Sequence, residues 1–267
     1  MSTAFLLALF SASVLAAPAP PPQADTNSTD PQATAQAAAM TAATTLSSQA
    51  GAFPQVGQNI SNLGDSLTTY ETTLGTTLNI QSTVNTDAAS GCTAMTVIFA
   101  RGTTEPGNVG ILAGPPFFDA LETMVGKSAV TVQGVDYPAD IPGFLVGGSP
   151  QGSQTMADMV TSALSTCPST KVVMSGYSQG GQLVHNAAKI LPASTMAKVN
   201  SAVIFGDPDD GEAVQGLAAS KTKVICHAGD DICAHGDLVL AAHLTYSQNA
   251  GEAASFVAAV ADLAIGN

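Results

Sequence analysis

Bulky aromatic and basic side chains are both scarce in this sequence. It contains no Trp, and aromatic residues make up only 5% of the chain, so a core has to be built mainly from Ala, Val, Ile and Leu. Lys and Arg total 7 against 20 Asp and Glu, which gives a formal net charge of -13. A surface this acidic repels nucleic-acid phosphates and anionic lipid head groups, so we expect neither as a partner.

Apolar runs long enough to cross a membrane are also missing. The apolar stretch Phe5–Ala17 is shorter than the roughly 20 residues that a span needs. Val14 and Ala16 fit the small-residue cleavage pattern of signal peptides, and Pro18 follows the stretch. We therefore expect a signal peptide over residues 1–16 and a secreted, extracellular protein with no membrane anchor, present as a monomer.

Cysteine is rare but even in number, with four residues. An oxidising compartment would pair them, and because the sequence has no CxxC we expect no zinc site. A calcium-binding loop of the Asp-x-Asp-x-Asp-Gly type is absent as well, and we expect no metal or cofactor. Three connectivities are open; the short spacing favours Cys226 with Cys233, which leaves Cys92 with Cys167. Secretion would also make two glycosylation acceptors relevant, at Asn27 and Asn59.

The character of the sequence changes near Cys92. Residues 17–91 form a low-complexity extension, of which 18–50 is so poor in large apolar residues that we expect disorder. Residues 58–82 are a candidate amphipathic helix because apolar residues recur there at steps of three and four. We expect residues 92–267 to form the catalytic domain.

From Cys92 onward, short apolar runs alternate with helical patterns. The runs predict strands at Thr93–Phe99, Ala129–Gln133, Val172–Ser175, Val199–Phe205 and Lys223–Cys226. The helical patterns lie at Pro116–Val125, Ser153–Ser165, Gln179–Ile190 and Gly251–Ile265. This alternation predicts an α/β three-layer sandwich around a mainly parallel five-stranded sheet, with ligands bound beyond the carboxyl ends of the strands.

One strand runs directly into Gly176-Tyr-Ser-Gln-Gly180, and a helix follows. A GxSxG pentapeptide in this context predicts a nucleophile elbow with Ser178 at its apex. The alternative is an ordinary Ser in a strand-to-helix turn. A catalytic serine needs a histidine base and an acid, and in hydrolases of this topology both follow it in the chain. The candidates are His227, His235 and His243 and, upstream of His243, Asp230, Asp231 and Asp237.

Four motifs together resemble the fungal cutinase family. They are Phe99-Ala-Arg-Gly-Thr-Thr-Glu-Pro-Gly-Asn108, Gly176-Tyr-Ser-Gln-Gly180, Cys226-His-Ala-Gly-Asp230-Asp-Ile-Cys233 and Ala242-His-Leu244. The resemblance covers roughly Cys92 to the C-terminus and does not extend to the first 91 residues. It implies a small, lidless α/β-hydrolase-like domain and supports the disulfide pairing given above.

The resemblance also implies roles for individual residues. Ser178 would be the nucleophile, His243 the base and Asp230 the acid. The amides of Thr103 and Gln179 would form the oxyanion hole, and Val239 and Leu244 would line the acyl side of a shallow crevice, although both could equally be core residues. Asp231 has no implied role, and we expect it, like Asp207, Asp209 and Asp210, in a solvated loop.

The implied activity is that of a carboxylic ester hydrolase acting on cutin polyester and short-chain acyl esters. Two alternatives remain from the sequence. Acetylxylan esterases share the triad and the fold but act on acetylated polysaccharide. A secreted surface-binding protein could instead have kept the scaffold without catalysis.

Overall fold

The computed structural model describes residues 31–85 and 91–263. Five parallel strands form its centre, in the order β3-β2-β4-β5-β6. They are β2 (Met95–Ala100), β3 (Val130–Gly134), β4 (Lys171–Tyr177), β5 (Ser201–Phe205) and β6 (Thr222–Ile225). All five expected strands are confirmed, and the parallel sheet is as predicted. The expected signal peptide and Asn27 lie outside the described residues.

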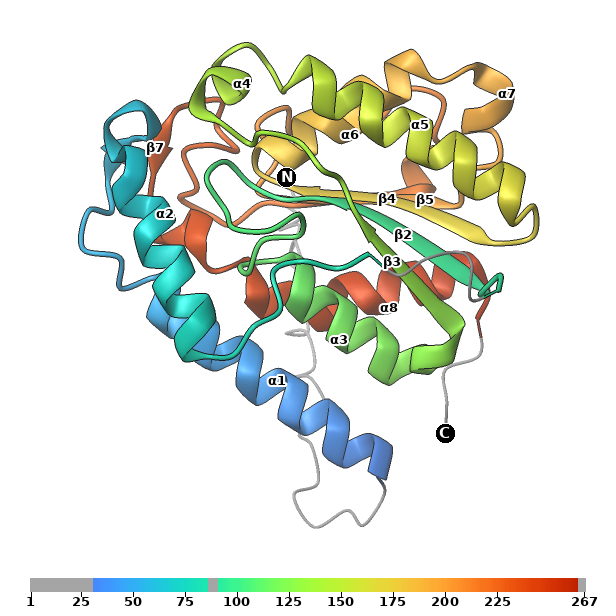
Figure 1. The fold of residues 1–267 in the computed structure, drawn as a ribbon, viewed down its shortest axis with the longest axis horizontal. Helices are drawn as coiled ribbons and strands as arrows, with labels where there is room; N and C mark the ends of the chain where they lie inside the picture. The colour runs from blue at the N-terminus through green and yellow to red at the C-terminus, as the bar shows by residue number, and fades with distance from the viewer. Residues whose placement is uncertain (1–30, 86–90, 264–267) are drawn as a thin grey trace, which may run out of the picture.

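Helices cover both faces of the sheet (Figure 1). One face carries α5 (Pro150–Thr166) and α6 (Gln179–Ile190), and the other carries α3 (Gly114–Val125) and α8 (Ala250–Ala261). Two short helices, α4 (Ile141–Leu145) and α7 (Ala193–Met196), lie in the connections. The result is the predicted three-layer α/β sandwich.

The strands read as continuous apolar runs because both of their faces are buried. In β2, Val97 and Phe99 join the core under α3 and α8, whereas Ile98 and Ala100 join the core under α5 and α6. Two separate clusters therefore hold the sheet rigidly from both sides. This rigid sheet fixes the positions of the loops at the carboxyl ends of its strands.

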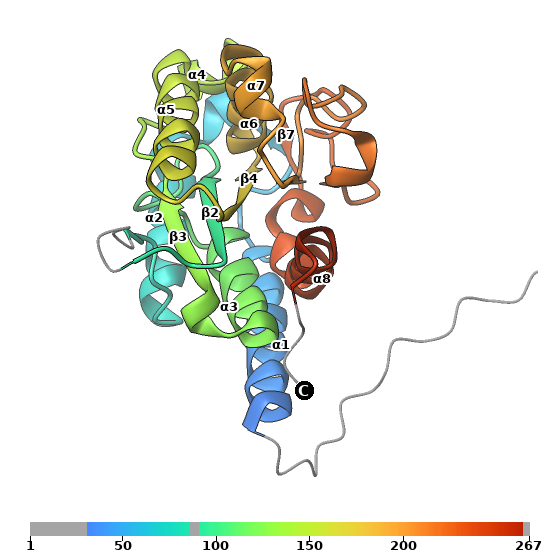
Figure 2. The same cartoon turned by 90° about the vertical axis from the view of Figure 1, so that its right-hand side faces the viewer.

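Residues 31–50, expected to be disordered, form helix α1 (Pro31–Ala50), which lies beside α3 (Figure 2). Leu46 and Ala50 are buried against the domain, and the Ser247 hydroxyl donates a hydrogen bond of 2.8 Å to the carbonyl oxygen of Ala43. The low apolar content hid this docking because most of the packed side chains are alanine, which buries little area each. The helix is thus stabilised by tertiary contact.

A second N-terminal helix, α2 (Ile60–Thr77), falls within the range 58–82 expected for an amphipathic helix. Strand β1 (Gln58–Asn59) precedes it and pairs antiparallel with β7 (Leu238–Val239) near the C-terminal part of the chain. Asn59, the second glycosylation acceptor, is exposed, and its side-chain amide donates to Asp237 at 2.6 Å. In the described part of the chain no helix has the length and apolarity to cross a bilayer.

Candidate active site

Ser178 lies at the sharp turn between β4 and α6. Its φ of 54° falls in the left-handed region that residues other than glycine rarely adopt. A Cβ at Gly176 would come within 2.2 Å of the Gly180 carbonyl oxygen, and one at Gly180 within 2.0 Å of the Ala100 carbonyl oxygen. Both positions therefore require glycine, and the pentapeptide forms the strained elbow that the sequence predicts.

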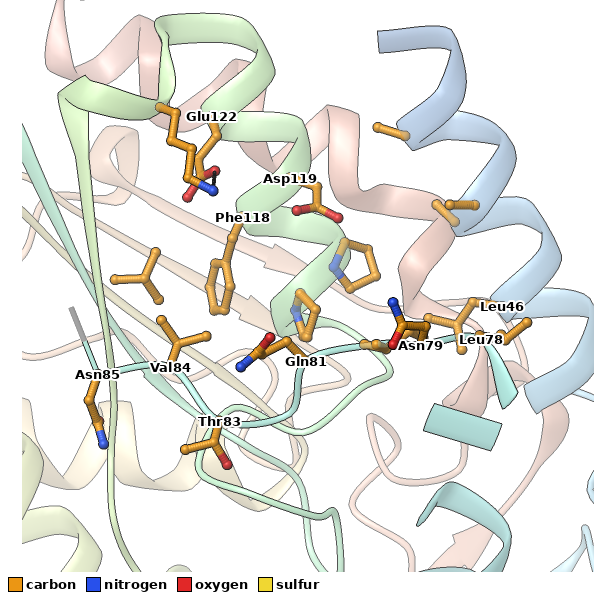
Figure 3. A pocket seen from close by; sticks show the side chains of 18 residues that line it. Leu46, Leu78, Asn79, Gln81, Thr83, Val84, Asn85, Phe118, Asp119 and Glu122 are labelled. Carbon is orange, nitrogen blue, oxygen red and sulfur yellow. Dashed lines mark ion pairs between the residues drawn. The ribbon is translucent and has the colours of Figure 1, made fainter. Parts of the chain in front are cut away.

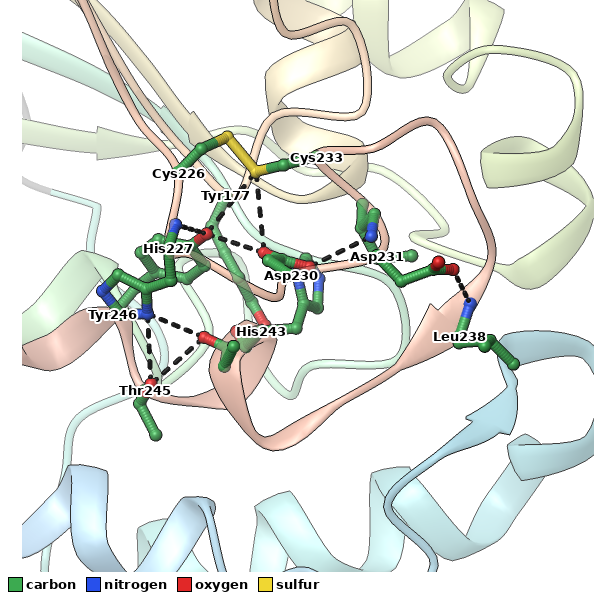
Figure 4. Close-up of polar contacts among 12 residues, drawn as sticks. Tyr177, Cys226, His227, Asp230, Asp231, Cys233, Leu238, His243, Thr245 and Tyr246 are labelled. Atoms are coloured by element: carbon green, nitrogen blue, oxygen red, sulfur yellow. Dashed lines mark hydrogen bonds and ion pairs between the residues drawn. A yellow bond between two sulfur atoms is a disulfide. The ribbon is translucent and has the colours of Figure 1, made fainter.

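Asp230 and His243 meet through a hydrogen bond of 2.8 Å between Nδ1 of the imidazole and Oδ2 of the carboxylate (Figure 4). The Ile232 amide donates to the other oxygen, Oδ1, at 3.0 Å. A disulfide between Cys226 and Cys233 closes the short loop that carries Asp230. The sequence therefore brings together one acid and one histidine that are 13 residues apart.

The charged form of the Asp230 carboxyl is favoured despite its burial. Desolvation acts to raise its pKa, but the hydrogen bond and charge of His243, with hydrogen bonds from Tyr246 and Ile232, outweigh it and hold the pKa below its ordinary value. Asp230 is therefore a carboxylate at neutral pH. A carboxylate in this place fixes the imidazole tautomer with its proton on Nδ1.

The other candidate acids and histidines are bonded elsewhere. Asp231 accepts from a main-chain amide, Asp237 accepts from a side chain of β1, and the two remaining histidines contact main-chain oxygens. The partners are Leu238 for Asp231, Asn59 for Asp237, Ala242 for His227 and Pro208 for His235. Only His243 and Asp230 of the six candidates bond to each other.

Ser178 and His243 line the same small cavity, together with Thr103, Val239 and Leu244. The cavity holds only about 10 Å³, room for roughly one water molecule. The two crevice residues from the sequence analysis thus lie beside Ser178, although both are buried in the core as well.

The cavity is closed by α2, which contributes Ile60, Leu67 and Glu71 to its lining. Ser178 is 2% exposed and His243 3% exposed. The expectation of a lidless crevice is therefore wrong for this chain. The family motifs begin near Cys92, so they carry no information about a helix that precedes them. We call α2 the lid helix; Figure 1 shows it beside β7.

Thr103 and Gln179 lie next to each other at the ends of β2 and β4. The Gln179 side-chain amide donates to Thr103 Oγ1 at 2.8 Å and to the Asp140 carbonyl oxygen at 2.9 Å. This pair of bonds ties the first residue of α6 to the loop after β2. The two main chains expected to form an oxyanion hole are thus held at a fixed separation.

Two charged residues, Arg101 and Glu105, hold the loop after β2 that carries Thr103. Both lie in the first of the four motifs, but no role was predicted for them. The Arg101 Nε donates to the Glu105 carbonyl oxygen at 2.7 Å. The Glu105 carboxylate accepts from the amides of Gly102, Ile111 and Leu112 at 2.8–2.9 Å. Both side chains are buried, so the loop that carries Thr103 is rigid before any ligand arrives. The signal in the sequence was an Arg and a Glu that flank Thr103 within the short Arg-Gly-Thr-Thr-Glu motif, which indicates an ion pair or hydrogen bonds within this loop.

Glu71 is a third residue that the sequence analysis did not single out. It belongs to the lid helix, its side chain is buried against the domain, and the Thr104 hydroxyl approaches its Oε2 at 3.4 Å. Burial and then the charge of Glu105 raise the pKa of Glu71 well above 4.5, against the opposing effects of Thr104 and Arg101. The closed lid therefore favours a protonated Glu71.

His185, on α6, is buried, and so is Asp207, which we expected in a solvated loop. His185 Nε2 lies 2.9 Å from Asp207 Oδ2. Burial acts to lower the pKa of His185, but the bond and charge of Asp207 outweigh it and raise it. With Asp209 these residues place three potential metal ligands within 4.8 Å. The direct contact between the buried side chains of His185 and Asp207 is that of a structural pair.

A larger cavity, of about 670 Å³, lies elsewhere, between α1, α3 and the segment that follows α2 (Figure 3). Phe118, Asp119 and Glu122 line it from α3, and Leu46 and Leu78 line it from α1 and the end of α2. None of the residues expected in catalysis lines it. Volume alone therefore does not identify the reactive site.

Comparisons with known proteins agree with the geometry. A sequence model of the cutinase family matches residues 91–260. A cutinase of Botryotinia fuckeliana is 65% identical over 175 residues, which cover 66% of this chain and 87% of that protein. The structure of an acetylxylan esterase is more distant, with 27% identity and a TM-score of 0.50, and the match covers 64% of this chain and all of the other.

The structure of a Trichoderma reesei cutinase in complex with a C11Y4 phosphonate inhibitor is similar over 83% of this chain and 99% of that chain, with 42% identity and a TM-score of 0.69. This share exceeds the part that the family model matches, so the likeness includes residues before Gly91. Both disulfides, Cys92–Cys167 and Cys226–Cys233, are present in the fold as expected. The chain belongs to the cutinase family of carboxylic ester hydrolases.

Proposed function

We propose that this protein is a secreted, monomeric serine esterase that hydrolyses cutin polyester and short-chain acyl esters through an acyl-enzyme on Ser178. The supporting observation is that Ser178, at a strained elbow, and His243, which is hydrogen-bonded to Asp230, line one cavity at the carboxyl ends of the strands. Secretion is supported by the Phe5–Ala17 pattern and by two disulfides, which persist in oxidising compartments.

In the proposed reaction His243 removes the Ser178 proton while Oγ attacks the ester carbonyl carbon. The Thr103 and Gln179 amides stabilise the oxyanion, each contributing about 3 kcal/mol to lowering the barrier. His243 then protonates the leaving alcohol, and a water molecule, deprotonated by the same imidazole, releases the acid from Ser178. Asp230 keeps the imidazole oriented and stabilises its positive charge throughout.

Substrate can reach Ser178 only if the lid helix moves, because the closed cavity holds about one water molecule. The buried face of the helix is apolar at Ile60, Leu63 and Leu67, and Glu71 is its one buried carboxyl. An apolar surface such as a polyester could replace the contacts that these residues lose on opening. The proposal therefore includes an opening step before catalysis.

The cutinase assignment of substrate is favoured over the acetylxylan one by likeness. The relatives with 65% and 56% identity are both named cutinases, whereas the acetylxylan esterase structure has 27% identity. Comparing rates on p-nitrophenyl butyrate and on acetylated xylan separates the two. A preference for acetylated xylan would overturn the cutin assignment while leaving the serine mechanism intact.

The decisive test compares the wild type with Ser178→Ala on p-nitrophenyl esters of increasing acyl length. We expect the variant to lose at least about 10⁴-fold in kcat. A serine-reactive phosphonate should label the wild type and not the variant, and peptide mass spectrometry should place the label on Ser178. Absence of labelling in a folded, open protein would instead support the non-catalytic binding protein.

A further inference from the structure

Tyr246 stands out among the buried polar residues around the site. The chain has four tyrosines, and the hydroxyls of the other three donate to main-chain oxygens. Those acceptors are Gln49 for Tyr70, Arg101 for Tyr137 and His243 for Tyr177. The Tyr246 hydroxyl alone donates to a carboxylate, Oδ2 of Asp230, at 2.6 Å (Figure 4).

The direction of this hydrogen bond is fixed by a second contact. The Tyr246 oxygen accepts the main-chain N–H of His227 at 3.0 Å, so its own single proton is left for Asp230. Burial, and then the hydrogen bond to Asp230, raise the pKa of Tyr246. The phenol therefore remains a donor at every pH at which an esterase of this kind would work.

The ring is held as firmly as the hydroxyl. It is fully buried and stacks on the His227 imidazole, with 4.2 Å between ring centroids. Phe205 and Tyr177 pack against it, and its edge faces His243 at 6.1 Å. The donor is thus preorganised on the same carboxylate oxygen that accepts the His243 Nδ1–H.

We infer that Tyr246 is a positioning residue of the proposed triad, whose phenol shares Oδ2 of Asp230 with His243 and so limits how strongly the carboxylate holds the imidazolium. The inference rests on the proposed function. Two donors share the negative charge of this one oxygen. The hydrogen bond from the Tyr246 phenol therefore weakens the attraction of Oδ2 for the His243 imidazolium. Removing the phenol would leave the whole charge of Oδ2 to His243.

Other titratable groups near the pair come from separate elements. Glu71 reaches the cavity from the lid helix, Tyr177 from β4 and His227 from the loop after β6, while the charge of Asp210 acts on Tyr246. All four are unchanged when only the Tyr246 hydroxyl is removed. A comparison of two proteins that differ by that hydroxyl therefore isolates its effect on the pH profile.

The test measures kcat and KM of Tyr246→Phe on a soluble p-nitrophenyl ester against pH. We expect KM unchanged and the midpoint of the acidic limb of the kcat profile moved upward by about half a pH unit, because the freed charge of Oδ2 favours the imidazolium. Tyr137→Phe is the matched control, because it removes a buried hydroxyl that donates at 2.6 Å to a main-chain oxygen. The control should not move the midpoint.

A second measurement does not require the variant to fold. Growth on 3-fluorotyrosine makes every phenol a stronger donor, and only the one at Tyr246 faces a carboxylate, so the midpoint should move downward. An unmoved midpoint in both Tyr246→Phe and the fluorinated protein, or an equal shift in Tyr137→Phe, would overturn the inference. If phosphonate still labels Ser178 in those proteins, only the role of Tyr246 fails; without labelling of the wild type, the proposed function fails first.

Discussion

Replacing Glu71 by Gln should keep the lid helix closed at alkaline pH. In the closed state Glu71 lies next to Glu105, with Arg101 and His243 also nearby, and its pKa is well above 4.5. In an open state the side chain would be in water and ionise near 4.5. Since the closed state holds the extra proton, its stability is fully present below pH 4.5 and is lost as the pH rises toward the pKa of the buried group.

The size of the effect follows from this difference. Between the two pKa values, each unit of pH reduces the stability of the closed lid by about 1.4 kcal/mol, a tenfold gain in the open fraction. Gln is uncharged at all pH values, so the variant lacks this gain. The ratio of wild-type to variant labelling rates should be near one at about pH 4.5 and rise with pH. It should level off at a value whose logarithm equals the difference between the pKa of Glu71 in the closed state and in the open state.

The assay is the rate at which a soluble phosphonate labels Ser178, between about pH 4.5 and pH 9. Asp65→Asn is the matched control, because Asp65 is an exposed acid on the same helix. A ratio that stays at one across the range, or that Asp65→Asn reproduces, would refute a pH-dependent lid.

Two further predictions concern the loop that carries Thr103 and the disulfide between Cys92 and Cys167. Thr103→Ala keeps the main-chain amide but removes the hydroxyl that accepts from the Gln179 side chain, so kcat should fall about fivefold to tenfold. Thr103→Ser keeps this hydroxyl, and its kcat should stay near that of the wild type. Equal losses of kcat in both variants would show that packing, and not this hydrogen bond, is responsible. Replacing Cys92 and Cys167 with Ser should lower the free energy of unfolding by about 4 kcal/mol, measured in urea, with kcat unchanged, and a loss of kcat in still-folded protein would contradict this separation.

The sheet and the elbow could be predicted from the sequence because their signals are local. Apolar runs bounded by turn residues give the strands, and the GxSxG pentapeptide between a strand and a helix gives the place of Ser178. The partners of Ser178 could not be chosen from spacing alone, because three acids and three histidines follow the last strand. Motif resemblance selected Asp230 and His243, and these two are hydrogen-bonded in the fold.

The N-terminal segment was predicted least well, for two physical reasons. Helix α1 packs mainly through alanines, whose small buried area does not distinguish them from the same residues in a disordered linker. Glu71 is a carboxyl in an otherwise polar stretch, and carboxyls are almost never fully buried, so its position under the lid depends on tertiary contacts alone. Glu71 and Ser178, 107 positions apart in the sequence, come to one cavity only through the tertiary fold.

The pairing of β1 with β7 has a consequence for anyone who shortens this enzyme. Truncation at Cys92 would uncover Ser178, but it would also leave Leu238 and Val239 without their strand partner, a few residues upstream of His243. Such a shortened protein would expose unpaired main-chain groups that can pair with strands of other molecules. The segment that carries His243 would also lose the support of this strand pairing. Engineering faster access should therefore weaken the buried contacts of α2 and leave the pairing of β1 with β7 in place.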